Sequence, residues 1–142
     1  MKYDDASWHA GGQFPADLAP EAGATHIAMF VAWCVLHGLA GELHTDDLAD
    51  DLALLQVREL TPGQWLLRAC DGKFTDEDVN DDGNGFTAAY FEAEDMLYLE
   101  DYQNTLGGEL ASLYSVPDTW ASYDTLAPVI DARYAAWQSR AD

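Results

Sequence analysis

The stretch 78–84 has the closest match in this chain to a metal-binding motif. Its residues Asp-Val-Asn-Asp-Asp-Gly-Asn reproduce the opening of an EF-hand loop, in which carboxylate and amide oxygens surround calcium. The match then ends, because Gly85 stands where a hydrophobic residue is needed and Ala89 where a bidentate acid is needed. Glu92 comes three residues too late. We therefore expect no calcium site here, and a solvated turn between two helices.

Residues that could act as catalytic acids and bases are scattered along the chain. No two histidines stand four residues apart, and none has cysteines or carboxylates at zinc-ligand spacing. The sequence also has no Gly-rich phosphate loop and no GxSxG elbow. We expect structural or surface roles for the four histidines, which are His9, His26, His37 and His44. A small enzyme that uses His9 and His26 with Asp4 and Asp5 is kept as an alternative.

The two cysteines both belong to apolar stretches. Cys34 lies inside the run from Ile27 to Leu36, and Cys70 ends a second apolar segment. Small thiols in such places are usually buried in the core. We expect neither a disulfide nor a nucleophile, and the sequence predicts no cofactor and no metal.

Acidic residues dominate the charge of the chain. There are 26 Asp and Glu but 6 Lys and Arg, which gives a net charge of −20. Such a field repels nucleic acid and anionic membranes and attracts basic proteins. Two dense clusters are the predicted partner-binding residues: Asp46, Asp47, Asp50 and Asp51, and Asp76, Glu77, Asp78, Asp81 and Asp82.

The remaining residues can build a core, since 49% of the chain is apolar. A length of 142 residues fits one domain, 1–142, and no segment shows sustained strand alternation or an internal repeat. The prediction is a mainly α fold, a single compact multi-helix domain with an irregular N-terminal arm over residues 1–20. Large aromatic residues at helical spacing are expected in its core.

Capping signals place the helices. An apolar helix from about Glu21 to His37 should be central and should stop at Gly38. Thr45, Thr61, Thr75 and Ser115 each read as an N-cap for a following helix. Residues 80–85 should form a loop, 86–106 one helix, and Pro128 should divide the C-terminal region in two.

The N-terminal residues bear on whether the protein is secreted. The start MKYDDASWH has no apolar stretch behind its Lys, so we expect no secretory signal and a cytoplasmic protein. The longest apolar run holds ten residues, from Ile27 to Leu36, about half of what a membrane span requires.

Two strings carry a resemblance to a known family. The first is KYDDASWH at residues 2–9, followed by Gly12, Phe14 and Pro15, and the second is THIAMFVAW at residues 25–33. Further similarity returns at 113–114 and 127–131. The chain resembles a family of uncharacterised small acidic bacterial proteins, found in the company of toxin systems used between bacteria. The resemblance implies an immunity protein and assigns no catalytic residue.

Three functions follow as hypotheses. Charge and resemblance together favour an immunity protein that binds and neutralises a basic toxin domain in the cytoplasm. The first alternative is an acidic DNA mimic or another protein-binding adaptor, which needs carboxylates in a strip with duplex-like spacing. The second alternative is the small enzyme described above.

Overall fold

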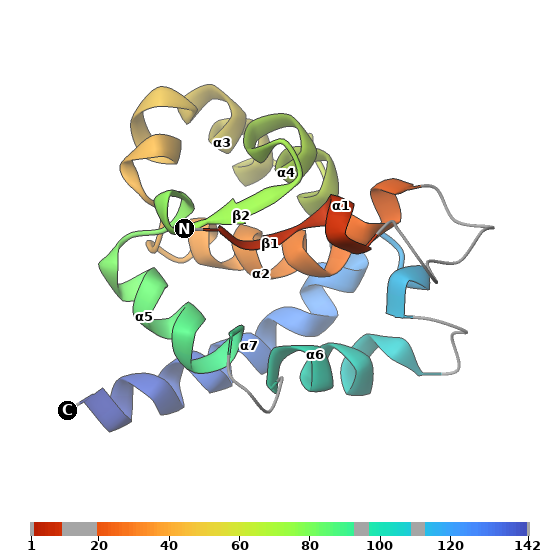
Figure 1. Cartoon of the computed structure of the whole chain (residues 1–142), viewed down its shortest axis with the longest axis vertical. Coiled ribbons are helices and arrows are strands. Elements are labelled where there is room, and N and C mark those ends of the chain that lie inside the picture. Colours follow the sequence, from red (N-terminus) through yellow and green to blue (C-terminus); the bar gives the residue numbers. More distant parts are fainter. Residues whose placement is uncertain (1, 10–19, 93–96, 109–112, 142) are drawn as a thin grey trace.

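The computed structural model describes residues 2–9, 20–92, 97–108 and 113–141 and confirms a mainly α fold (Figure 1). The helices are α1 (Ala6–His9), α2 (Thr25–Leu36), α3 (Ala49–Gln56), α4 (Pro62–Cys70), α5 (Asp81–Tyr90), α6 (Leu97–Tyr102) and α7 (Trp120–Ala141). Short 3-10 turns cover Pro20–Ala24, Asp76–Asp78 and Leu113–Ser115, and π-helical turns cover Leu43–Asp47 and Gln103–Gly107. The strands are β1 (Lys2–Asp5) and β2 (Lys73–Thr75).

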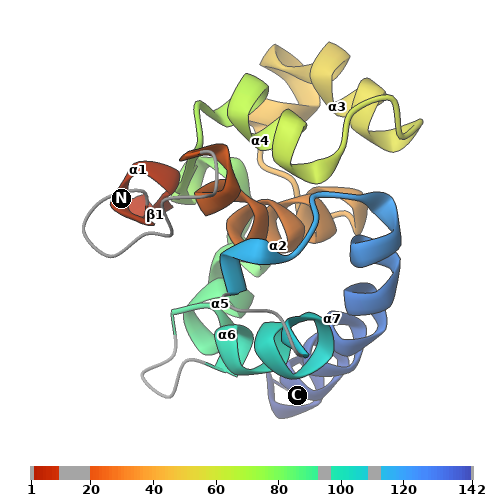
Figure 2. The ribbon, with the colours of Figure 1, turned by 90° about the vertical axis from the view of Figure 1, so that its right-hand side faces the viewer.

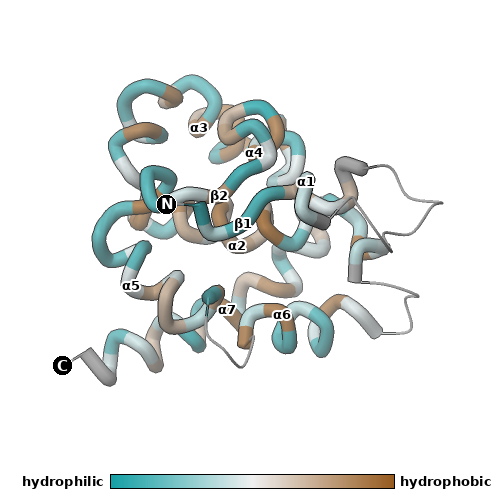
Figure 3. The backbone as a smooth tube through the Cα atoms, in the orientation of Figure 1, coloured by the Kyte–Doolittle hydropathy of each residue, from teal (hydrophilic) through white to brown (hydrophobic). Residues whose placement is uncertain are grey.

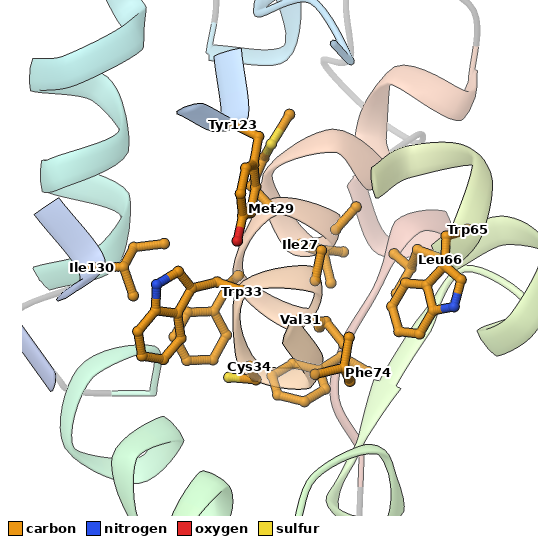
Figure 4. Close-up of a cluster of buried hydrophobic side chains, with 14 of the residues drawn as sticks. Ile27, Met29, Val31, Trp33, Cys34, Trp65, Leu66, Phe74, Tyr123 and Ile130 are labelled. Carbon is orange, nitrogen blue, oxygen red and sulfur yellow. The ribbon is translucent and has the colours of Figure 1, made fainter. Parts of the chain in front are cut away.

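Helix α2 is the centre of the fold, as its apolar run predicts. Its residues from Thr25 to Val35 are all buried. Helices α3 and α4 lie on one side of α2, and α5, α6 and α7 lie on the other (Figure 2). Side chains of α2 therefore face two ways, with Trp33 near Ile130 of α7 and Ile27 on the side of Leu66 of α4 (Figure 4). Fully burying one such side chain stabilises a fold by about 1.5–3 kcal/mol.

The ends of two helices follow the predicted signals. After α2, Gly38 adopts φ +79°, and the amide of Leu39 donates to the Cys34 carbonyl at 3.0 Å. At the start of α4, Thr61 Oγ1 accepts from the Gln64 amide and Gln64 Oε1 accepts from the Thr61 amide. Both capping predictions are confirmed.

The mainly α fold also contains two short strands that the sequence pattern does not reveal. Strands β1 and β2 pair antiparallel, with Lys2 opposite Thr75 and Asp5 opposite Lys73. These strands have four and three residues, too few to show alternation in sequence. They give regular structure to the start of the N-terminal arm, whose residues 10–19 lie outside the described part.

The predicted loop at residues 80–85 is instead the first part of α5. Asn80 Oδ1 accepts from the Gly83 amide at 2.9 Å and caps the helix, and Asp81 and Asp82 lie in its first turn, where the helix dipole favours negative charge. Gly83 is required by packing, because a Cβ there would lie 2.6 Å from Cβ of Val79. The Asn80 cap and the close packing of Gly83 thus belong to a helix, although the composition of the segment alone indicates a turn.

Two predicted N-caps are wrong. Thr45 lies within the π-helical turn Leu43–Asp47, and α3 begins later, at Ala49, with Leu52 and Leu55 buried. Ser115 lies in a 3-10 turn, and Thr119 Oγ1 accepts from the Ser122 amide at the start of α7. Thr75 does form its capping box with Asp78, but on a 3-10 turn.

The long helix predicted over 86–106 is also wrong, since α5 ends at Tyr90 and a turn and a bend follow at 91–92. Pro128 does not divide the C-terminal region, because α7 continues through it. Proline removes one backbone hydrogen bond from a helix. The buried residues Leu126 and Ile130 on either side of Pro128 pack into the core and offset that loss.

Among the large aromatic side chains that the structure describes, Trp8 does not lie in the core as expected. Trp33, Trp65 and Tyr98 are fully buried, whereas Trp8 is 58% exposed. Within the described residues, no helix has the length and apolar character needed to cross a lipid bilayer.

Candidate functional site

Backbone pairing brings together the two segments that carry the acidic clusters, residues 46–51 and 76–82. Ala40 forms a bridge with Val79, the amide of Gly41 donates to the Asp78 carbonyl at 3.1 Å, and the amide of Asn80 donates to the Leu39 carbonyl at 2.8 Å. Gly41 permits this approach, because a Cβ there would collide with the backbone carbonyl of Glu77. Residues 37 to 41 positions apart in the chain therefore lie side by side.

Between these segments lies a hollow of about 610 Å³, which we call the acidic groove. Its carboxylates come from both segments, and its wall includes Thr45 and Asn80. In Figure 3 teal alternates with brown along the tube before α3, and residues 40–43 and 45–47 of this stretch line the groove. The acidic residues of the groove are Glu42, Asp46, Asp47, Glu77 and Asp81.

The basic side chains that the structure describes lie outside the groove. Of the six Lys and Arg, the five whose side chains the structure describes all form ion pairs with carboxylates outside the groove. The pairs are Lys2–Asp5, Arg58–Asp124, Arg68–Asp51, Lys73–Asp71 and Arg133–Asp101. None of these cations neutralises the groove, so its negative charge is left for a ligand.

The nine residues predicted to bind a partner fall in different places. Four line the acidic groove: Asp46, Asp47, Glu77 and Asp81. Asp50 and Asp82 are exposed outside its lining, and Asp76 is half-buried. Asp51 is half-buried and bound to Arg68 at 2.9 Å. Asp78 is 3% exposed, so its carboxylate faces the interior rather than a partner.

Beside the groove, Asp78 joins two other side chains in a cluster that we call the buried trio. His44 Nε2 lies 2.8 Å from Asp78 Oδ1, and Cys70 Sγ lies 3.7 Å from His44 Nε2 and 3.6 Å from Asp78 Oδ1. His44 is fully buried, while Cys70 is partly exposed. Burial, with the nearby Asp78 carboxylate, raises the pKa of the Cys70 thiol far above its usual range.

Sequence reasoning missed the trio because its members do not stand at any motif spacing. His44 is 26 residues from Cys70, and Cys70 is 8 residues from Asp78. The pairing of Gly41 with Asp78 brings His44 to Asp78, and α4 places Cys70 beside them. The expectation of a buried thiol holds for Cys34 and only in part for Cys70.

Of the residues considered for an enzyme, His26 and Asp4 lie close together. His26 Nε2 lies 3.7 Å from Asp4 Oδ2, but His26 is 2% exposed and packs against the rings of Tyr102 and Tyr114. The hydrogen bond from Lys2 lowers the pKa of Asp5 to about 2, although burial opposes this. The His9 side chain lies outside the described part.

Comparison with protein families gives one match. Residues 2–116 match the family described as a domain of unknown function (DUF7832). The chain belongs to this family. No curated protein and no solved structure matches it.

The matched region contains the whole acidic groove and the buried trio, together with the strings at 2–9 and 25–33. Helix α7 lies beyond it but completes the core, since Trp33 Nε1 donates to Asp131 Oδ1 at 2.8 Å. A site common to the family would therefore be sought in the groove or the trio rather than on α7.

Proposed function

We propose that this protein is a cytoplasmic immunity protein that binds a basic toxin domain through the acidic groove and neutralises it without catalysis. The groove and the net charge of −20 support the basic partner. The toxin system rests on the resemblance carried by residues 2–9 and 25–33.

The observation that carries the proposal is the separation of charge over the surface. Glu42, Asp46, Asp47, Glu77 and Asp81 gather in one hollow, while the described cations pair with other carboxylates. Lys or Arg from a partner would form charge-assisted hydrogen bonds there and relieve the repulsion between neighbouring carboxylates. The same field would accelerate association with a basic surface.

The concave shape favours a basic protrusion over a DNA-binding protein as partner. A DNA mimic must present carboxylates on a convex strip, because proteins that bind DNA envelop a rod of phosphates. A hollow of about 610 Å³ has the size of a site that takes a ligand or a few side chains of a partner. The enzyme alternative has less support, because His26 is buried within the core.

Two variants of equal charge change test the role of the groove. The groove variant replaces Asp46, Asp47, Glu77 and Asp81 with their amides. The control variant does the same to exposed acids outside the groove lining: Asp50, Glu59, Asp82 and Glu100. Each is co-expressed with the product of the neighbouring gene, which the proposal expects to be the toxin, and binding is measured by surface plasmon resonance.

We expect the wild type and the control variant to protect cells and the groove variant to lose protection. Association should slow by about 10-fold or more as salt rises from low to high ionic strength, whereas dissociation changes less. If cells die equally with and without the wild-type protein, and no complex survives purification, the immunity function is wrong. If both variants lose binding equally, net charge rather than the groove recruits the partner.

A further inference from the structure

We propose that His44, Cys70 and Asp78 form a binding site for a zinc-like divalent metal ion, with a fourth position open to water. Their donor atoms Nε2, Sγ and Oδ1 all lie within 4.8 Å of one another. Imidazole, thiolate and carboxylate together are ligands typical of zinc, and three protein ligands with an open position are typical of its catalytic sites.

The separations of the donor atoms fit one ion at their centre. Zinc bonds of about 2.3 Å to sulfur and about 2.0 Å to nitrogen or oxygen place tetrahedral ligands roughly 3.3–3.6 Å apart. The sulfur of Cys70 lies 3.7 Å from His44 Nε2 and 3.6 Å from Asp78 Oδ1. The remaining separation, His44 to Asp78, is 2.8 Å and needs to open by about half an ångström.

The same geometry argues against a Cys-His-Asp catalytic triad. In a triad the nucleophile and the carboxylate bind opposite nitrogens of the imidazole. Here Cys70 and Asp78 both lie at Nε2 of His44, and Nδ1 is buried without a hydrogen-bond partner in the described part of the chain. Three donors that converge on one point suit a cation better than a proton relay.

The surrounding backbone holds two of the ligands in place. Asp78 Oδ2 accepts from the Thr75 amide at 2.8 Å, which leaves Oδ1 turned toward His44 and Cys70. The His44 amide donates to the Gly41 carbonyl at 3.0 Å. A partner such as the Thr75 amide fixes the orientation of a carboxylate ligand.

A route for the ion follows from the neighbours of the ligands. Thr45 and Leu43 flank His44, Glu77 and Val79 flank Asp78, and all four line the acidic groove. Its carboxylates would raise the local concentration of cations, and Cys70 is partly exposed. On binding, the thiol of Cys70 releases its proton to solvent and the sulfur lone pair forms the bond to the metal.

Cobalt(II) is the probe that reports on the sulfur ligand. We expect the wild-type protein, under reducing conditions, to bind one Co²⁺ and show a thiolate-to-cobalt charge-transfer band with intense tetrahedral d–d bands. Zn²⁺ should displace the cobalt and raise the melting temperature. Cys70→Ser should abolish the charge-transfer band and weaken Zn²⁺ binding by at least about 100-fold.

Three controls separate the trio from the acidic surface. His37→Gln changes an exposed histidine and should bind metal like the wild type, and the groove variant should keep the charge-transfer band. In the wild type, Zn²⁺ should slow the reaction of one thiol with a disulfide reagent, which needs no substitution. No cobalt–thiolate band, a band that survives Cys70→Ser, or a thiol that zinc does not protect would each overturn the proposal.

Discussion

Phe30 is the position at which truncation tests the core of this fold most directly. It lies on α2, is fully buried, and its ring centroid is within 6.0 Å of five other aromatic rings. These rings come from β2, α5, α6 and the turn after α5: Phe74, Phe86, Tyr90, Phe91 and Tyr98. Phe30→Ala removes the ring that joins these elements to the central helix.

The expected loss in the free energy of unfolding is about 4–5 kcal/mol. Burial and cavity terms for Phe→Ala amount to about 3–5 kcal/mol. The upper half of that range applies because the surrounding rings belong to four different segments and cannot all move inward to fill the cavity. Phe30→Leu keeps most of the volume and should cost about 1.5 kcal/mol.

Urea titrations followed by circular dichroism measure the effect. The dependence of the free energy on urea should stay unchanged, so the midpoint alone should move. Trp8→Ala is the control, because that ring is 58% exposed and rests under the Lys2 ammonium, and it should cost less than about 1 kcal/mol. A loss below about 1 kcal/mol for Phe30→Ala would refute the placement of this ring in the core.

Three further predictions concern charge, backbone and calcium. Burial acts to raise the pKa of Asp101, but hydrogen bonds from Arg133 and Tyr90 and the charge of Arg133 outweigh it and lower that pKa. The stabilisation is therefore present above the unfolded pKa of about 4 and is lost as pH falls through the folded pKa. Asp101→Asn should therefore cost about 1–2 kcal/mol at pH 7, and an equal cost at pH 3 would contradict this. Pro128→Ala should stabilise the protein by about 1–2 kcal/mol in thermal unfolding, since it restores a backbone donor within α7; a lower melting temperature would count against the reasoning. Calcium near 1 mM should leave the melting temperature unchanged, and a saturable rise abolished by Asp82→Asn would revive the EF-hand hypothesis for 78–84.

The central helix and the cap of α4 could be read from sequence because their causes are local. An uninterrupted apolar run from Ile27 to Val35 can only be buried, whichever elements cover it. The Thr61 cap needs residues within one helical turn, and Gly38 needs only its own freedom at positive φ. The mainly α class follows from several such signals together.

Local signals misled where a distant contact competes with them. Residues 80–85 have turn composition, but the Asn80 amide donates to the Leu39 carbonyl and Tyr3 Oη donates to Asn84 Oδ1, and these distant contacts hold the segment where it is helical. Ser115, followed by Asp118 three residues later, has the local pattern of a capping box, yet Asp118 accepts from Thr61 Oγ1 and the Gly63 amide of α4. A carboxylate binds whichever donors the fold presents, and sequence does not reveal donors 55 residues away.

For the site, the residues alone show the excess of carboxylates and the two segments that concentrate them. The folded protein adds that Asp46, Asp47, Glu77 and Asp81 share a groove, that Asp78 turns inward, and that His44 and Cys70 meet it. Charge is a property of composition, whereas concavity and contacts between side chains depend on distances between atoms. The pairing of Gly41 with Asp78 sets those distances, and no local pattern encodes it.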